Sequence, residues 1–250
     1  MSLLTLSITL GFVVIALGLS KWLKLGVEKD LMIATVRSTI QLLIVGYILN
    51  TVFSLHGAIF IILMIILMIG AATQNAQKRG KPLKGVAWRV LVAITLTEII
   101  TQSLMLIFHI VDASPRYIIP ISGMIIGNSM IIAGLFLNRM KAEVNSRRQE
   151  ILVLLSLGAT PKQAIRSVLK EAIRASLIPT IDSTKTMGLV QLPGMMTGQI
   201  IAGADPITAV RYQLLIVFTL LAAASLTSIT LGFLVAPTLF NEYQQLRELG

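Results

Sequence analysis

Two ionisable side chains lie inside apolar stretches that are long enough to cross a membrane. Arg37 falls about seven residues into the stretch 31–50, and Glu98 about ten residues into 88–110. A charged group inside a bilayer costs roughly 2.5–3.5 kcal/mol on insertion scales, so such residues are candidates for function. If both stretches enter the membrane from the same side, their depths differ by about one helical turn and a salt bridge is within reach. We expect Arg37 and Glu98 to line or gate a transport pathway, or to form a buried pair that fixes helix register.

Amide side chains extend these two polar positions. Gln41 follows Arg37 by one helical turn, and Gln102 follows Glu98 in the same way. Asn128 lies in the middle of another apolar stretch, where an amide either lines a path or bonds a neighbouring helix. We therefore include all three amides among the candidate pathway residues.

The intramembrane stretch "LPGMMTGQ" combines a helix breaker with thioethers. Pro193 and Gly194 predict a break or hinge, beside Gln191, Met195 and Met196. Thioethers suit soft metals such as Cu(I) and suit Fe(III) poorly, and methionine is also ordinary core filler. The pattern favours a hinge near the pathway, and we assign no metal ligand. The sequence also shows no H-E-x-x-H or nucleophile-elbow motif, so we expect no catalytic or cofactor-binding residue and no cofactor.

Composition identifies the class of protein that holds these residues. The chain has 250 residues, of which 55% are hydrophobic and 13% charged, and its mean hydropathy is +0.85. A helix needs about 20 mostly apolar residues to cross a bilayer. The sequence thus predicts an all-α polytopic membrane protein with about seven spans, at 3–20, 31–50, 57–73, 88–110, 116–137, 177–203 and 211–236. The sixth is interrupted by polar residues 182–186, so a broken or re-entrant segment is the alternative there.

The distribution of basic residues predicts the orientation. Most of the 21 Lys and Arg residues fall in the loops after the first, third and fifth spans and in the C-terminal tail, which all lie on one side in a seven-span arrangement. Basic loops face the cytoplasm, so we expect the N-terminus outside and the C-terminus inside. The net charge of +10 is then a consequence of topology, and we expect no nucleic-acid partner.

The largest cytoplasmic segment, 138–176, carries a two-helix turn. Gly158 is expected to end a helix that begins near Arg148, in a left-handed conformation. Thr160, Pro161 and Gln163 then supply the N-cap, the first position and the third position of a new helix, which is a capping box.

The new helix is amphipathic. Its predicted apolar face contains Ala164/Ile165, Val168/Leu169 and Ala172/Ile173, and a basic ridge beside it contains Lys162, Arg166, Lys170 and Arg174. One interpretation is a helix that lies on the anionic inner leaflet. The other is a helix that docks on a partner protein, which the defined turn favours.

Several stretches resemble known permeases. "LLSLGATPKQAI" resembles the Glu-Ala-Ala loop of ABC-transporter permeases, whose short helix docks in a groove of the cytoplasmic ATPase. "RSTIQLLIVGYIL", "PISGMIIGNSM", "LSLGATPKQAI" and "KTMGLVQLPGMMTGQIIAGADP" resemble, in this order, stretches of the FetB-type (YbbM) permeases, which are associated with iron export. The resemblance implies one permease domain over 1–250 and a coupling role for Gly158, Ala159, Thr160, Pro161, Lys162, Arg166 and Lys170.

The expected function is the permease subunit of an ABC transporter that exports a metal ion, iron by resemblance. No G-x-x-x-x-G-K-[ST] loop occurs in the chain, so ATP hydrolysis is expected in a separate cytoplasmic ATPase and this chain is not expected to be an enzyme. Two ATP sites imply a homodimer of the permease, in the inner membrane of a bacterium. The alternatives are a secondary transporter or channel that works without an ATPase, and a membrane scaffold.

Overall fold

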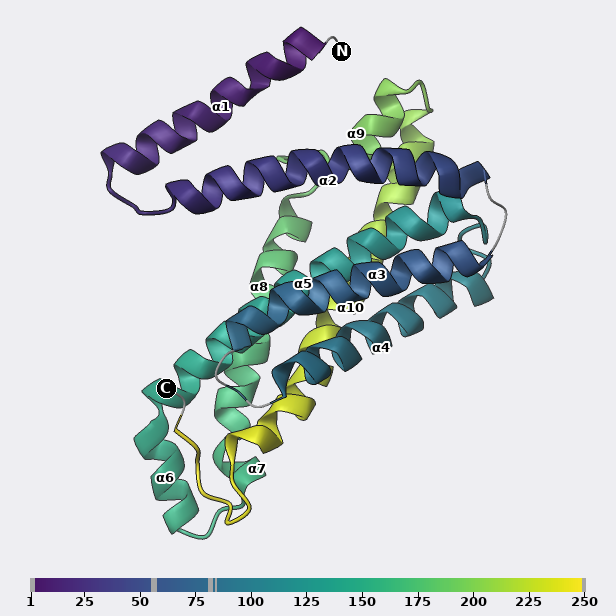
Figure 1. Ribbon diagram of the computed structural model, residues 1–250. Coiled ribbons are helices and arrows are strands. Elements are labelled where there is room, and N and C mark those ends of the chain that lie inside the picture. The colour runs from purple at the N-terminus through teal and green to yellow at the C-terminus, as the bar shows by residue number, and fades with distance from the viewer. Residues whose placement is uncertain (1–2, 55–57, 81–82, 84, 249–250) are drawn as a thin grey trace. The chain divides into compact units, whose positions relative to one another are not determined.

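The computed structural model describes residues 3–54, 58–80, 83 and 85–248, and this part of the chain is built from helices (Figure 1). Five of its helices are long and apolar enough to cross a membrane. They are α2 (Glu28–Ser54), α3 (Ala58–Gln77), α4 (Val86–Ile107), α5 (Pro115–Ser146) and α10 (Pro206–Val235). The prediction of an all-α, multi-pass membrane protein is thereby confirmed, and the total of seven spans and their orientation stay predictions.

The chain divides into two compact units, Met1–Gly57 and Ala58–Gly250. The first unit is a helical hairpin of α1 (Leu3–Trp22) and α2. Gly26 turns the chain between them with a φ of +73°, a conformation that glycine adopts without steric cost. The Ser20 hydroxyl donates a 2.7 Å hydrogen bond to the Glu28 carboxylate and so fastens the two helix ends.

The second unit is a bundle around α5. This helix packs against α3, α8 (Arg166–Thr186) and α10, and α4 packs against α3 and α10 (Figure 1). The bundle core is aliphatic, with Phe136, Leu137 and Met140 of α5 fully buried. Short interhelical hydrogen bonds supplement this packing. They are expected in a membrane, where the hydrophobic effect contributes little to the association of helices. Thr97 and Thr227 join α4 to α10 with 3.0 Å between their hydroxyl oxygens.

Two predicted segments differ from the structure. The predicted span 177–203 is not one helix: α8 ends at Thr186, and α9 (Gly194–Ile201) begins eight residues later. The segment 138–176 contains the predicted helices as α6 (Arg148–Ser156) and as α7 (Pro161–Ala164) with α8, and it differs in that α5 extends into it as far as Ser146. Three positions used in the sequence predictions lie outside the described residues. They are residue 57, where the predicted third span starts, and Lys81 and Lys84, two of the basic residues that predict the orientation.

The C-terminal segment folds back onto the end of the bundle that carries α6 and α7. A short 3₁₀ helix, η2 (Ala236–Leu239), follows α10, and Phe240 pairs with Leu246 across the turn after it. The Arg247 amide donates to the Leu239 carbonyl at 2.8 Å, and Arg148 forms an ion pair with Glu248 at 3.5 Å. The tail is therefore tied to the first turn of α6.

Candidate functional site

A polar pocket of about 220 Å³ lies between α5, α8 and α10. Asn128 lies about 20 Å along α5 from Pro115, and Val217 about 17 Å along α10 from Pro206, at 1.5 Å per residue. The pocket is therefore well inside both apolar spans rather than at their ends. Its lining residues are Asn128, Ile131, Pro179, Thr180, Ser183, Thr184, Met187, Val217 and Leu220.

Asn128 bonds a neighbouring helix, which is one of the two roles that the sequence left open, and its role in a path stays a prediction. Its side-chain amide donates a 3.2 Å hydrogen bond to the Leu220 carbonyl of α10, and the residue also lines the pocket. The bond fixes the amide in place, and an oriented amide in a membrane interior presents a defined dipole to whatever enters. Thr184 is fixed in a comparable way, because its hydroxyl donates to the Thr180 carbonyl at 2.8 Å.

The pocket lining is more apolar than polar, and the polar groups that it contains are neutral. Hydroxyl, amide and backbone oxygens suit hard cations, whereas the one thioether of the lining, that of Met187, accepts from Gln213 at 3.8 Å. The described residues contain no group of three or more His, Cys, Asp or Glu side chains that would hold a metal ion tightly.

The break in the predicted sixth span borders this pocket. Met187 follows the last residue of α8, and the next residue, Gly188, adopts a φ of +87° and donates its amide to the Gln191 carbonyl at 2.9 Å. Pro193 precedes the first residue of α9 in an extended conformation. The positive φ that turns the chain thus falls on Gly188, and Gly194 is the first residue of α9.

The predicted thioethers are placed differently from one another. Met195 packs against the apolar cluster that contains Met105 and Ile121, which is the role of core filler. Met196 is half-buried on α9, and Gln191 is exposed. None of these three residues lines the polar pocket. A role for Gln191, Pro193, Gly194, Met195 or Met196 in the pathway stays a prediction.

Glu98 and Gln102 form a second polar position, on the buried side of α4. Glu98 is 3% exposed, and within the described part of the chain neither its carboxylate oxygens nor the amide of Gln102 has a hydrogen-bond partner. The Ser122 hydroxyl of α5 lies beside the Glu98 carboxylate. An unpaired buried carboxylate costs several kcal/mol, so this group requires a cation, a proton or water.

The predicted partner of Glu98 belongs to the other unit. Arg37 and Gln41 lie one turn apart on α2, within Met1–Gly57, whereas Glu98 belongs to Ala58–Gly250. The ion pair would therefore join the two units, and it stays a prediction.

The turn at Gly158 has the geometry that its sequence predicts. Gly158 has a φ of +87°; its amide donates to the Leu155 carbonyl and that of Ala159 to the Leu154 carbonyl, both at 3.0 Å. These two bonds are those of a Schellman helix end. The next helix begins with a capping box, in which the Thr160 amide donates to the Gln163 side chain at 2.8 Å and the Gln163 amide donates back to the Thr160 hydroxyl at 3.4 Å.

The helix after this turn differs in one respect from the prediction. It is divided at Ile165, whose φ of −101° and ψ of 2° end α7 and start α8. The predicted apolar face is buried in the protein core, where Ala164, Val168 and Ala172 pack. This face contacts α5 and α10 rather than lipid, so the interpretation as a helix lying on the membrane by its apolar face is wrong.

The outward side of the turn is exposed. Leu157 is 79% exposed at the end of α6, and the basic ridge residues Lys162, Arg166, Lys170 and Arg174 are exposed as well. The outward side of the turn therefore presents one exposed leucine beside a row of cations.

Several residues of these sites escaped the sequence analysis. Thr180 and Thr184 repeat at helical spacing, which is a signal for a polar stripe on α8, but the interrupted hydropathy of this segment concealed it. Met187 and Ser183 carry no local signal, because they line the pocket only through the packing of three helices. The Arg148–Glu248 pair joins residues too far apart in sequence to be inferred from spacing.

Known proteins match this chain over nearly its whole length. The family model described as "Uncharacterised protein family (UPF0014)" matches residues 3–240. The membrane protein YjkA of Bacillus subtilis is 55% identical over 248 residues, which cover 99% of each chain. The "Probable iron export permease protein FetB" of Escherichia coli is 43% identical, over 97% of this chain and 93% of its own.

A plant protein extends the comparison. "Protein ALUMINUM SENSITIVE 3" of Arabidopsis thaliana is 33% identical over 94% of this chain and 86% of its own. No solved structure matches this chain significantly. The predicted resemblance to FetB-type permeases is confirmed. The chain therefore belongs to the UPF0014 family of multi-pass membrane proteins.

Proposed function

We propose that this protein is the membrane-spanning permease of an ABC transporter and that it exports a metal cation. The observation that carries the proposal is the rigid turn at Gly158, with a Schellman end on α6, a capping box on α7 and an exposed Leu157 between them. A helix that transmits motion from a partner must be held at a fixed angle to the bundle, and these bonds hold it. The docking surface consists of Gly158, Ala159, Thr160, Pro161, Lys162, Arg166 and Lys170.

The partner is a separate cytoplasmic ATPase, since the chain carries no phosphate-binding loop of its own. If this ATPase docks on the Gly158 turn, the turn lies in the cytoplasm, which agrees with the distribution of basic residues. We infer seven membrane crossings, with α8 and α9 together forming the sixth, the N-terminus outside and the C-terminus inside. The two structural units then belong to one permease domain, in the inner membrane of a bacterium.

The polar pocket on α5, α8 and α10 is the proposed cation path. Neutral oxygen ligands bind a hard cation weakly enough to release it, as transport requires. Iron is the candidate cargo because the relative FetB is named a probable iron export permease. Asn128 and Thr184 are the residues that would contact the cation, and Glu98 is a candidate gating residue with Gln102, Arg37 and Gln41.

A polar side of α8 supports assembly as a homodimer. Asp182 and Lys185 form an exposed ion pair at 3.3 Å, on the same helix segment that lines the pocket. Exposed charges at membrane depth require water or protein beside them rather than lipid. A second permease copy that encloses a water-filled path satisfies this requirement and supplies the second ATPase docking surface.

The proposal is tested by transport in inside-out vesicles, where export is measured as uptake. Vesicles that contain the permease and its partner ATPase should accumulate Fe²⁺ only when ATP is hydrolysed. Uptake that persists with a hydrolysis-deficient ATPase, or without the ATPase, would show a secondary transporter or a channel instead.

A further inference from the structure

A groove of about 670 Å³ lies at the α7 end of the Ala58–Gly250 unit. It runs between the start of α8 and the chain segment around η2, and its volume falls within the roughly 300–1,000 Å³ of ligand sites. Most of its wall is apolar: Ile165, Leu169, Phe233, Ala236, Pro237 and Phe240. Two exposed cations, Lys162 and Arg166, also line it, and neither forms an ion pair with any described residue.

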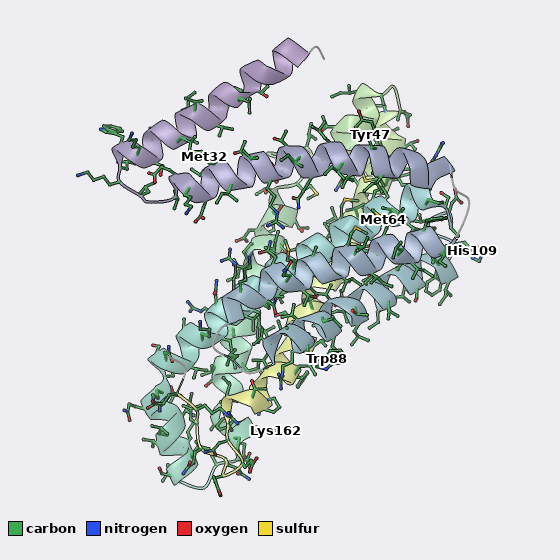
Figure 2. The ribbon with its side chains drawn as sticks, in the orientation of Figure 1. Met32, Tyr47, Met64, Trp88, His109 and Lys162 are labelled. Carbon is green, nitrogen blue, oxygen red and sulfur yellow. The ribbon has the colours of Figure 1, made fainter. Side chains whose placement is uncertain are left out.

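The position of the groove along the bundle follows from contacts of the first turn of α4. Arg89 donates from Nε to the Leu234 carbonyl at 2.8 Å, so Phe233 and Leu234 lie level with the start of α4. Trp88 in that turn is 67% exposed, and exposed tryptophan is enriched at the boundary between lipid and water. Figure 2 shows Trp88 toward the Lys162 end of this unit and His109 at its other end. The groove therefore starts at the level of the lipid headgroups.

The two ends of the groove differ in chemistry. Phe233 is 70% exposed at the end that lies in the apolar span of α10, where lipid surrounds the protein. Lys162 and Arg166 lie on α7 and at the start of α8, on the side of Leu169 that leads away from the α8 interior, and Leu169 itself lies beside Gly232. An apolar channel that opens toward lipid, with two cations at its outer end, is complementary to a molecule with an acyl chain and a negative headgroup.

We propose that, while no ATPase is docked, this groove binds one anionic phospholipid, with the phosphate at Lys162 and Arg166 and an acyl chain along Leu169 and Phe233. Both cations also belong to the proposed docking surface, so lipid and ATPase would share them. The proposal rests on the proposed orientation, which places this end of the bundle in the anionic cytoplasmic leaflet. A segment of a soluble ATPase fits less well, because the Phe233 end of the groove lies level with the first turn of the apolar helix α4. The bound lipid would brace α8 against the C-terminal segment beneath the docking turn.

The test uses the purified full-length permease without any ATPase, so that it is independent of the docking proposal. The protein is exposed to mixed micelles of phosphatidylglycerol or phosphatidylcholine, and bound lipid is measured by native mass spectrometry. We expect one tightly bound phosphatidylglycerol per chain and no tightly bound phosphatidylcholine. Lys162→Ala with Arg166→Ala should weaken phosphatidylglycerol binding about thirtyfold, roughly fivefold for each cation removed.

Two further variants make the result specific. Lys170→Ala with Arg174→Ala removes the same charge from α8 alone, outside the groove, and should bind phosphatidylglycerol as the unmodified protein does. Ala236→Trp fills the groove, keeps both cations and should also abolish binding. Equal losses in the two double-alanine variants would show a general surface attraction and would overturn the proposal. Displacement of the lipid by glycerol phosphate, which has no acyl chain, would likewise contradict it.

Discussion

The hydroxyl oxygens of Ser176 in α8 and Ser228 in α10 lie 2.7 Å apart, and both side chains are fully buried. The Ser176 hydroxyl also donates to the Ile173 carbonyl at 2.7 Å. Its single hydrogen is therefore engaged, and Ser228 must be the donor between the two serines. The bond joins the helix that carries the basic ridge to the helix that ends at η2.

Because Ser228 donates the hydrogen bond and Ser176 accepts it, alanine substitutions of the two serines should have unequal effects. Ser176→Ala removes the acceptor of Ser228 and leaves a buried donor, so it should lower the free energy of unfolding by roughly 1–3 kcal/mol. Ser228→Ala leaves Ser176 bonded to Ile173 and should cost about 0.6 kcal/mol. Unfolding in mixed detergent micelles measures both values, with Ser225→Ala as the control because Ser225 bonds within α10 alone. Equal losses would contradict the assigned donor.

The proposed pair of Arg37 and Glu98 predicts a recovery in a double variant. Glu98→Gln alone would leave Arg37 without its counterion and should destabilise the protein by roughly 3–5 kcal/mol. Arg37→Gln combined with Glu98→Gln should recover most of this loss, whereas Asp112→Asn, at an exposed position, should change little. Unfolding free energies of the single and double variants test the pair, and strictly additive losses would show that the two side chains do not interact.

The proposed cation path predicts that one hydroxyl in the pocket matters more than a similar one outside. Thr184→Val removes an oxygen from the lining, so ATP-dependent Fe²⁺ uptake into inside-out vesicles should fall about tenfold, which corresponds to about 1.4 kcal/mol. Thr219→Val is the matched control: Thr219 also bonds a carbonyl of its own helix, but it does not line the pocket. A similar fall in both variants would point to helix stability rather than to the path.

The proposed topology is tested by single cysteines, since the chain has none of its own. Lys78→Cys, Asn145→Cys and Lys162→Cys should react with an impermeant maleimide only from the cytoplasmic side, and Ala113→Cys only from outside; all four positions are exposed. Gly80 is unsuitable because an added Cβ would lie 2.5 Å from Val86. Labelling of Lys162→Cys from outside would reverse the orientation and remove the docking surface from the cytoplasm.

The features that could be predicted from sequence are those that a few neighbouring residues determine. Gly158, Thr160 and Gln163 lie within six residues of one another and make their bonds locally, so their geometry follows from residue type and spacing. The apolar spans are recognisable for a similar reason, because each helix carries its own hydropathy. The break after α8 was recognised as an alternative, but its turning residue is Gly188 rather than Gly194.

Features that depend on helix packing could not be predicted in this way. The spacing of Gly123 and Gly127 indicates close helix contact, but among described residues a Cβ at Gly127 would meet nothing within 4 Å. A Cβ at Gly123 would lie 3.7 Å from Met68 of α3, which is an ordinary contact. Closer approaches occur at Gly134 and Gly232, where a Cβ would lie 2.9 Å from Arg79 and 3.0 Å from Leu169. The polar pocket likewise forms only where three helices meet, and no single segment of sequence encodes it.

The central claim is that the turn at Gly158 docks the permease on its ATPase. Gly158→Val should disfavour the positive φ of this residue by about 1–2 kcal/mol, whereas Gly158→Asn is the control because asparagine tolerates that conformation. A Cβ at this position would meet no described atom within 4 Å, so both changes act through the backbone. The decisive measurement is the affinity of the purified ATPase for each variant in detergent without anionic lipid. We predict binding about five- to thirtyfold weaker for Gly158→Val and unchanged for Gly158→Asn. Equal affinity of the ATPase for both variants and the unmodified permease would contradict the claim.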